Sequence, residues 1–388
     1  MTTTTHAGYA RCTPLETATG WVYGRTTPPP LPGTRRTPRE ALDDAIRPAL
    51  LAGPCYVTFS GGRDSSAVLA AATALARREG HPLPIPVTRC YPDIPATDES
   101  RWQRMVIDHL GLSEWVRFEL RKDESDLLGD TARAGLRTRG LLWPAPLQAH
   151  GFVFEQLHGG SLLTGEGGDA VFGARRITPL TVMRRRGKPS RALVGGAITS
   201  SLPRPLRRRR AERRARTSAQ SRWLTPAALE RHARLVANDA AQEPLRYDEA
   251  TWAIRWWRSF TTIRHNHTLA AAEFGITAHD PLIDAGFLAA LARAGGVGGF
   301  LGRTSVMRAL FSDVLPPEVV ARQTKAAFNL VNRGEATTEF ARSWDGSGVD
   351  HDLVDAERLR EVWLSDRPTM ATGLLLQQAW MASEGLLP

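Results

Sequence analysis

The stretch that decides the fold is Cys55–Arg78, CYVTFSGGRDSSAVLAAATALARR, in which a short apolar run, a glycine-rich turn and a helical pattern follow one another. The run CYVTFS predicts a buried strand, and the residues after the turn predict a helix. Gly61 and Gly62 allow successive backbone N–H groups to point into one concavity. The N-terminus of the helix adds partial positive charge and unpaired N–H groups. The stretch therefore predicts an anion-binding site.

The side chains of this turn suggest phosphate and a metal ion. Ser60, Ser65 and Ser66 offer hydroxyl donors, whereas Asp64 is a carboxylate that would repel a phosphate. A cation between the two groups removes that repulsion, so Asp64 indicates Mg²⁺. The turn is not a Walker A loop, because the chain contains no G-x-x-x-x-G-K-[ST] sequence.

A second glycine-rich turn lies about a hundred residues later, in Ser161–Gly173, SLLTGEGGDAVFG. Here too an apolar run enters the turn, and the turn contains two acids, Glu166 and Asp169. Three glycines within four residues are costly unless the backbone needs positive φ or closely approaches a ligand. This turn is therefore a second candidate for the same binding site.

Together the two turns resemble a known family. S-G-G-x-D-S is similar to the pyrophosphate loop of the ATP pyrophosphatases, and the second turn resembles the G-E-G-x-D-E-L-F-G signature of the asparagine synthetases, with Ala170-Val171 at the E-L pair. Relatives of that family include β-lactam synthetase and the lasso-peptide cyclases. The resemblance implies an ATP-dependent ligase that attaches AMP to a substrate carboxylate, releases pyrophosphate and transfers the acyl group to an amine.

The resemblance also implies cofactors and site residues. It makes Asp64 and Asp169 the ligands of Mg²⁺, gives Glu166 a role in handling protons at the attacking nitrogen, and has Lys325 stabilise charge on the adenylate. A lysine in that role has a physical basis, since an ammonium stabilises developing negative charge. The residues that it implies for ATP are Ser60, Gly61, Gly62, Asp64, Ser65, Ser66, Gly165 and Gly167.

Weaker matches extend the resemblance to residues 50–335, and one of them departs from the family pattern. Thr277 stands where the family has a glutamate, and His279 stands where it has an arginine. His279 titrates near neutral pH and could take over proton transfer, or it could order its loop through hydrogen bonds. Both interpretations stay open. The weaker matches are Thr97–Ser100, Gly275–Asp284 and Leu315–Phe328.

Alternation of strands and helices predicts an α/β fold, a doubly wound parallel sheet with its ligand at the carboxyl ends of the strands. The segments CYVTFS, PIPVTRCY and SLLTG are the expected strands, and residues 220–330 are mostly helical in pattern. Residues 1–38 are rich in Thr, Pro and Gly and predict a loose arm. Residues 39–388 are expected to form the ligase domain, beginning with a helix capped by Thr37.

Positive charge is concentrated in residues 184–216. This basic insertion contains thirteen lysines and arginines and one acid, Glu212, so its net charge of about +12 exceeds the +10 of the whole chain. It is either a docking site for an acidic partner, such as a substrate or leader peptide, or a solvated arginine-rich surface hairpin. The absence of interleaved aromatic residues argues against binding of single-stranded nucleic acid.

The expected function is amide formation on a peptide natural product, with a lasso-cyclase-like macrolactam as the favoured reaction. Acid and amine would then belong to one precursor peptide. Ammonia-dependent amidation of a small acid, a tRNA-modifying pyrophosphatase and a degenerate non-catalytic scaffold are the alternatives. Only about fifty residues precede the synthetase-like region, so a glutaminase domain is not expected. Few cysteines, no leader and no long apolar run favour a cytoplasmic protein without a membrane segment.

Overall fold

The structure is a computed structural model of the 388-residue chain. It describes residues 8–186, 190–218, 221–324, 326, 331–366 and 368–387. No helix within these ranges combines the length and the apolar character that crossing a bilayer requires.

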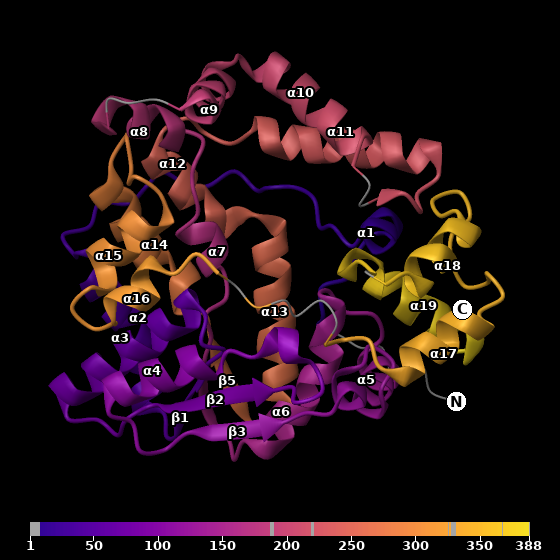
Figure 1. Ribbon diagram of the computed structural model, residues 1–388, viewed down its shortest axis with the longest axis horizontal. Helices are drawn as coiled ribbons and strands as arrows, with labels where there is room; N and C mark the ends of the chain where they lie inside the picture. The colour runs from indigo at the N-terminus through magenta and orange to yellow at the C-terminus, as the bar shows by residue number, and fades with distance from the viewer. Residues whose placement is uncertain are drawn as a thin grey trace.

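A five-stranded parallel sheet forms the base of the molecule (Figure 1). From β1 the chain moves outward to β2 and β3 on one side, then returns to place β4 and β5 on the other. The strand order therefore reverses between β1 and β4, and folds of this kind bind their ligands at the carboxyl ends of the two strands that flank such a reversal. The doubly wound parallel sheet is confirmed. In the order β3-β2-β1-β4-β5 the strands are Val116–Glu119, Ile85–Cys90, Cys55–Thr58, Gly160–Leu163 and Ile276–His279.

Alternating side chains of the central strands reach two different cores. Val57 and Leu163 pack with α2 (Pro38–Leu51), α3 (Arg63–Glu79) and α4 (Ser100–Leu110) on one face. Tyr56 and Leu162 pack with α6 (Gly151–Gln156) and α13 (Arg258–Ala272) on the other. This is the period of two that a strand imposes on its side chains. Burial of both faces explains why apolar residues stand at successive positions of β1 and β4.

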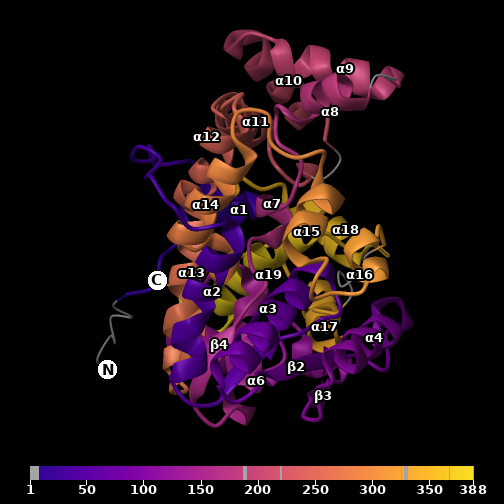
Figure 2. The same cartoon turned by 90° about the vertical axis from the view of Figure 1, so that its left-hand side faces the viewer.

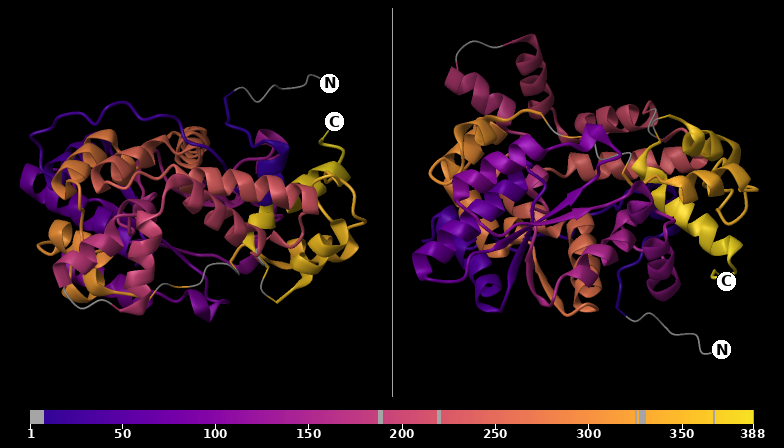
Figure 3. Two further views of the ribbon diagram at one scale, coloured as in Figure 1. Left: turned by 90° about the horizontal axis from the view of Figure 1, so that it is seen from above. Right: turned by 60° about the horizontal axis from the view of Figure 1, so that its bottom comes forward.

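The C-terminal half is mostly helical, as the sequence predicts, but it also contributes β5, which the sequence analysis does not identify. A further core, rich in tryptophan, lies beside the sheet domain and includes Trp223, Trp344, Trp363 and Trp380. The helices of this half are α11 (Pro226–Ala241), α12 (Tyr247–Trp252), α14 (Ala285–Gly295), α15 (Arg303–Phe311), α16 (Pro317–Ala321), α17 (Glu335–Ser343), α18 (Ala356–Leu364) and α19 (Gly373–Ser383). Helix α5 (Asp130–Arg139) contacts both α6 and α19, and the yellow C-terminal helices lie to one side of the sheet (Figure 3).

Part of the N-terminal arm is helical and buried, whereas residues 26–36 form no helix or strand and are mostly exposed. Residues Pro14–Thr19 form a buried helix, α1, closed at its start by a capping box between Thr13 and Glu16. The Glu16 carboxylate is buried and accepts two hydrogen bonds from the Arg258 guanidinium and one from the backbone N–H of Tyr23. Composition predicted a loose arm because composition does not reveal the buried ion pair between Glu16 and Arg258, which lie 242 positions apart.

The basic insertion forms helices that extend from the body of the molecule (Figure 2). They are α8 (Thr178–Arg186), α9 (Arg191–Ser201) and α10 (Arg204–Arg216). Helix α10 lies along α11 and so forms a helical hairpin with it (Figure 1).

Candidate active site

The turn after β1 is a compact loop that leads directly into α3. The Ser65 hydroxyl accepts a hydrogen bond from the Ser60 N–H at 3.2 Å, donates one to the Gly62 carbonyl at 3.1 Å and lies 3.1 Å from the Ser60 hydroxyl. Gly61 has φ +79°, which strongly favours glycine. The loop therefore presents its serine hydroxyls and the start of α3 at the carboxyl end of β1.

The turn after β4 packs against this loop. A Cβ added to Gly168 would lie 2.3 Å from the Asp64 Cγ, and one added to Gly165 would lie 2.9 Å from the Ser65 backbone nitrogen. Only residues without a side chain allow such an approach. Gly165 and Gly168 are therefore explained by contact with the first turn, whereas Gly167 has φ +81° and lies against Ile283.

The two predicted metal ligands meet at one guanidinium group. Arg303 Nη2 lies 2.6 Å from both carboxylate oxygens of Asp64, and Nη1 bonds to Asp169. Two carboxylates that share one cationic group form a donor set suited to Mg²⁺. Among the described residues no three His, Cys, Asp or Glu side chains gather as a metal site. A Mg²⁺ ion here would take its remaining oxygens from phosphate and water.

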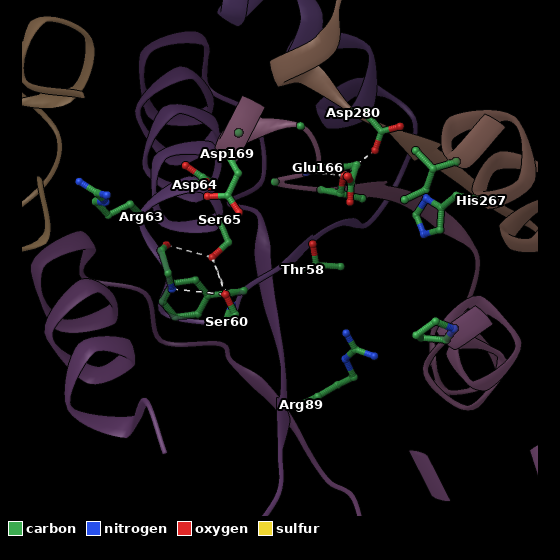
Figure 4. Close-up of a pocket in the computed structure, with 18 of the residues that line it drawn as sticks. Thr58, Ser60, Arg63, Asp64, Ser65, Arg89, Glu166, Asp169, His267 and Asp280 are labelled. Atoms are coloured by element: carbon green, nitrogen blue, oxygen red, sulfur yellow. Dashed lines mark hydrogen bonds between the residues drawn. The ribbon is translucent and has the colours of Figure 1, made fainter. Parts of the chain in front are cut away.

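Glu166 lies near a third carboxylate, Asp280, which follows β5 (Figure 4). The Thr164 hydroxyl donates to Asp280 at 2.5 Å and accepts from the Glu166 N–H at 3.1 Å. Burial, assisted by the charge of Asp280, raises the pKa of Glu166 to about 7. A carboxyl group with that pKa can both accept and release a proton near neutral pH.

Both turns open into one cavity of about 750 Å³. Its far wall is formed by Arg89 at the end of β2, by His150 and Phe154 at α6 and by His267 on α13. The rings of His150 and His267 are 6.2 Å apart. Burial lowers the pKa of both imidazoles, so they are neutral at neutral pH. The cavity thus has one end formed by the two glycine-rich turns, the expected phosphate-binding end, and a mixed apolar and polar end.

Most of the predicted site residues line this cavity. They are Ser60, Gly62, Asp64, Ser65, Gly165, Glu166, Gly167 and Asp169. Gly61 and Ser66 do not line it: Gly61 lies against Gln103, and the Ser66 hydroxyl is buried without a hydrogen-bond partner. Lys325 lies outside the described residues.

His279 is not among the residues that line the cavity, whereas its neighbour Asp280 is. The His279 Nε2 atom is buried and unpartnered, and burial lowers the pKa of the ring. Successive side chains of an extended segment point in opposite directions. That rule predicts that only one of His279 and Asp280 faces Glu166, and the tertiary fold decides that it is Asp280.

Arg303 is a second residue that the sequence analysis does not identify, and no local signal marks it. It begins α15, and its role depends on the positions of Asp64 and Asp169, which lie 239 and 134 residues away. Only the tertiary fold brings these three side chains together.

A buried ion pair between Arg322 and Glu99 supports the first loop. Arg322 donates to both oxygens of Glu99, at 2.5 Å for the Nη2 bond, and also donates to the Gly61 carbonyl at 3.0 Å. Its guanidinium lies over the Trp102 ring, 4.5 Å from the centroid. Two of the weakly matching segments, around Thr97–Ser100 and Leu315–Phe328, therefore meet at the phosphate loop.

Comparison with family models identifies the family of this chain. A family model described as asparagine synthase matches residues 37–382, nearly the whole chain. A search of curated proteins found no significant match.

Proposed function

Because the chain belongs to the asparagine synthase family, a family of ATP-dependent ligases, we propose that it is an AMP-forming amide ligase. It would activate a substrate carboxylate as an acyl-adenylate and transfer the acyl group to an amine. The observation that carries this proposal is the convergence of the Ser60–Ser65 loop, the two aspartates and Glu166 on one cavity at the switch point of the sheet.

In the first step, a substrate carboxylate oxygen attacks the α-phosphorus of ATP, and the bond to pyrophosphate breaks. The Ser60–Ser65 loop and the N-terminus of α3 would hold the leaving phosphates through N–H and hydroxyl groups. Asp64 and Asp169 would hold Mg²⁺, which supplies charge neutralisation at the departing pyrophosphate.

In the second step, an amine nitrogen attacks the activated carbonyl, and the carbon–oxygen bond to AMP breaks. The nitrogen must lose a proton as the amide forms. Glu166 supports this role because its pKa of about 7 leaves much of it as carboxylate at neutral pH. The negative charge of Asp280 would help to keep the pKa of Glu166 raised.

For the substrate we favour a peptide that is closed into a macrolactam. The mixed end of the cavity, with Phe154, His150 and His267 beside charged Arg89, suits a peptide segment better than it suits ammonia and a small acid. Ammonia-dependent amidation remains the competing reaction. Macrolactam closure removes the mass of one water from the peptide, whereas amidation replaces a hydroxyl with an amino group.

The test uses the whole protein, MgATP and a panel of carboxylates labelled with ¹⁸O. Transfer of one label into AMP, with release of pyrophosphate, is the expected result. Production of ADP and orthophosphate would contradict the proposal. Asp64→Asn should remove most adenylation, and the exposed Asp313→Asn is the matched control.

A further inference from the structure

The basic insertion carries an unusual excess of unpaired charge on its last helix. Helix α10 has no buried residue. Its exposed arginines without an acidic partner among the described residues are Arg204, Arg208, Arg209, Arg210, Arg213 and Arg214.

Four acids on α10, on α11 and just beyond α11 are already engaged with other groups. Glu212 and Glu230 both bind Arg216, at 2.6 Å each. On and beyond α11, Asp239 accepts the backbone N–H of Gly24 at 2.9 Å, and Glu243 accepts that of Arg176 at 3.1 Å. The positive charge of α10 is therefore not balanced from within the described fold.

The spacing of these arginines places like charges next to one another on the surface of α10. Arg204 and Arg208, Arg209 and Arg213, and Arg210 and Arg214 are each four residues apart, and like charges at this spacing destabilise a helix. The hairpin is held instead by Arg207, which donates to the carbonyls of Leu202 and Ala241 at 3.0 and 2.7 Å. An anionic ligand along α10 would relieve the repulsion without disturbing that anchor.

Two features favour a peptide over nucleic acid as this ligand. The chain has no aromatic residue between Phe172 and Trp223 on which bases could stack. Large apolar side chains are exposed beside the arginines instead: Ile198 on α9 is 59% exposed and Leu206 on α10 is 50% exposed. Guanidinium groups interspersed with apolar side chains match a segment rich in Asp or Glu that also carries apolar residues.

The insertion is also anchored next to the phosphate-binding end of the cavity. Its first helix, α8, follows α7 (Gly168–Val171), the element that carries Asp169. The Thr181 hydroxyl donates to the Gly298 carbonyl at 2.5 Å, in the segment that leads to Arg303. The start of the insertion is therefore joined to elements that frame the cavity.

We propose that α9 and α10 form a docking surface for an acidic, partly apolar polypeptide segment. Binding at this surface does not depend on the ligase reaction. The further step, that this acidic segment is part of the ligase's own peptide substrate, rests on the proposed function.

The test is fluorescence anisotropy with the full chain and a labelled peptide of repeating Glu-Glu-Leu. Binding should weaken as salt rises, because the contacts are exposed charges. The triple variant Arg209→Gln, Arg210→Gln and Arg213→Gln should weaken it at least tenfold. The matched control removes the same charge elsewhere, at exposed Arg35, Arg101 and Arg104, and should change it less than twofold.

Equal losses in the two triple variants, or no binding of the peptide at low salt, would overturn the proposal. So would tighter binding of a single-stranded oligonucleotide or of phosphatidylserine vesicles than of the peptide. Neither variant should unfold at a lower temperature than the parent, because the substituted arginines are exposed. Measuring pyrophosphate release separately keeps a failure of docking distinct from a failure of the ligase assignment.

Discussion

Glu166 is the residue whose chemistry is most sensitive to pH. Its carboxyl is buried near Asp280, and its pKa is raised to about 7. The carboxylate, which is the form able to accept a proton, therefore becomes populated only as pH rises through about 7. The sequence alone indicated an acid in this turn, but the raised pKa comes from burial and from a charge that follows a distant strand.

We predict that Glu166→Gln separates the two half-reactions. Substrate-dependent ATP–pyrophosphate exchange should persist, while amide formation should fall by about 10²–10⁴-fold, the usual loss of a general base. In the parent protein, amide formation should rise with pH through about 7. Both are measured by product analysis across pH.

A structural defect would not produce this pattern. Because ionising Glu166 costs folding free energy once pH exceeds its unfolded-state pKa, the neutral glutamine should not lower stability at pH 8. Full amide synthesis by Glu166→Gln would remove this residue from the mechanism.

Arg303 gives a second prediction at this scale, concerning the metal. In Arg303→Met the carboxylates of Asp64 and Asp169 lose the cation that they share, so their repulsion should lower the unfolding temperature. Adding MgCl₂ should restore it, and by more than it stabilises the parent. The measurement is differential scanning calorimetry with and without Mg²⁺, and a Mg²⁺ response equal to the parent's would argue against this ion site.

At the scale of elements, the site consists of two turns that are supported by contacts with other parts of the chain. The first turn is held by its own serines and by Arg322, whose guanidinium joins Glu99 to the Gly61 carbonyl. The second turn contacts the first through glycines. Neither turn could keep this shape as an isolated segment, because its supports come from other parts of the chain.

Removing one partner of this brace should be severe. Glu99→Gln leaves the Arg322 charge buried without its counter-ion, and we expect a loss of about 3–5 kcal/mol in the free energy of unfolding. The exposed Glu318→Gln should change it by less than about 0.5 kcal/mol. Urea denaturation measures both, and similar values for the two variants would contradict the brace.

At the scale of the whole molecule, the N-terminal segment fastens the sheet domain to the tryptophan-rich core. Its helix α1 packs in that core, and the Glu16 side chain binds Arg258 of α13, a helix that packs on one face of the sheet. Burial acts to raise the pKa of Glu16, but the bonds from Arg258 and from backbone N–H groups outweigh it and lower the pKa. The stabilisation is therefore present above the unfolded-state pKa and is lost as pH falls through the lower folded-state value.

We predict that Glu16→Gln releases this segment locally. Trypsin should then cut after Arg11 and Arg25 several-fold faster than in the parent at pH 7, because a buried charged hydrogen bond is lost. The control variant Glu40→Gln alters an exposed helix cap and should leave these rates unchanged. Cleavage at equal rates in all three proteins would show that Glu16 does not hold the arm.

The sequence by itself determined the strand–turn–helix units, the two glycine motifs and the family resemblance, because each depends on residues close together along the chain. Local chemistry was also enough to place the start of α2 at Thr37, which caps it. Tertiary structure alone decided that Arg303 joins the two aspartates, that Asp280 rather than His279 lines the cavity, and that the arm docks through Glu16. These contacts join residues more than a hundred positions apart. Burial and charge at such sites are properties of the packed molecule and leave no periodic trace in the sequence.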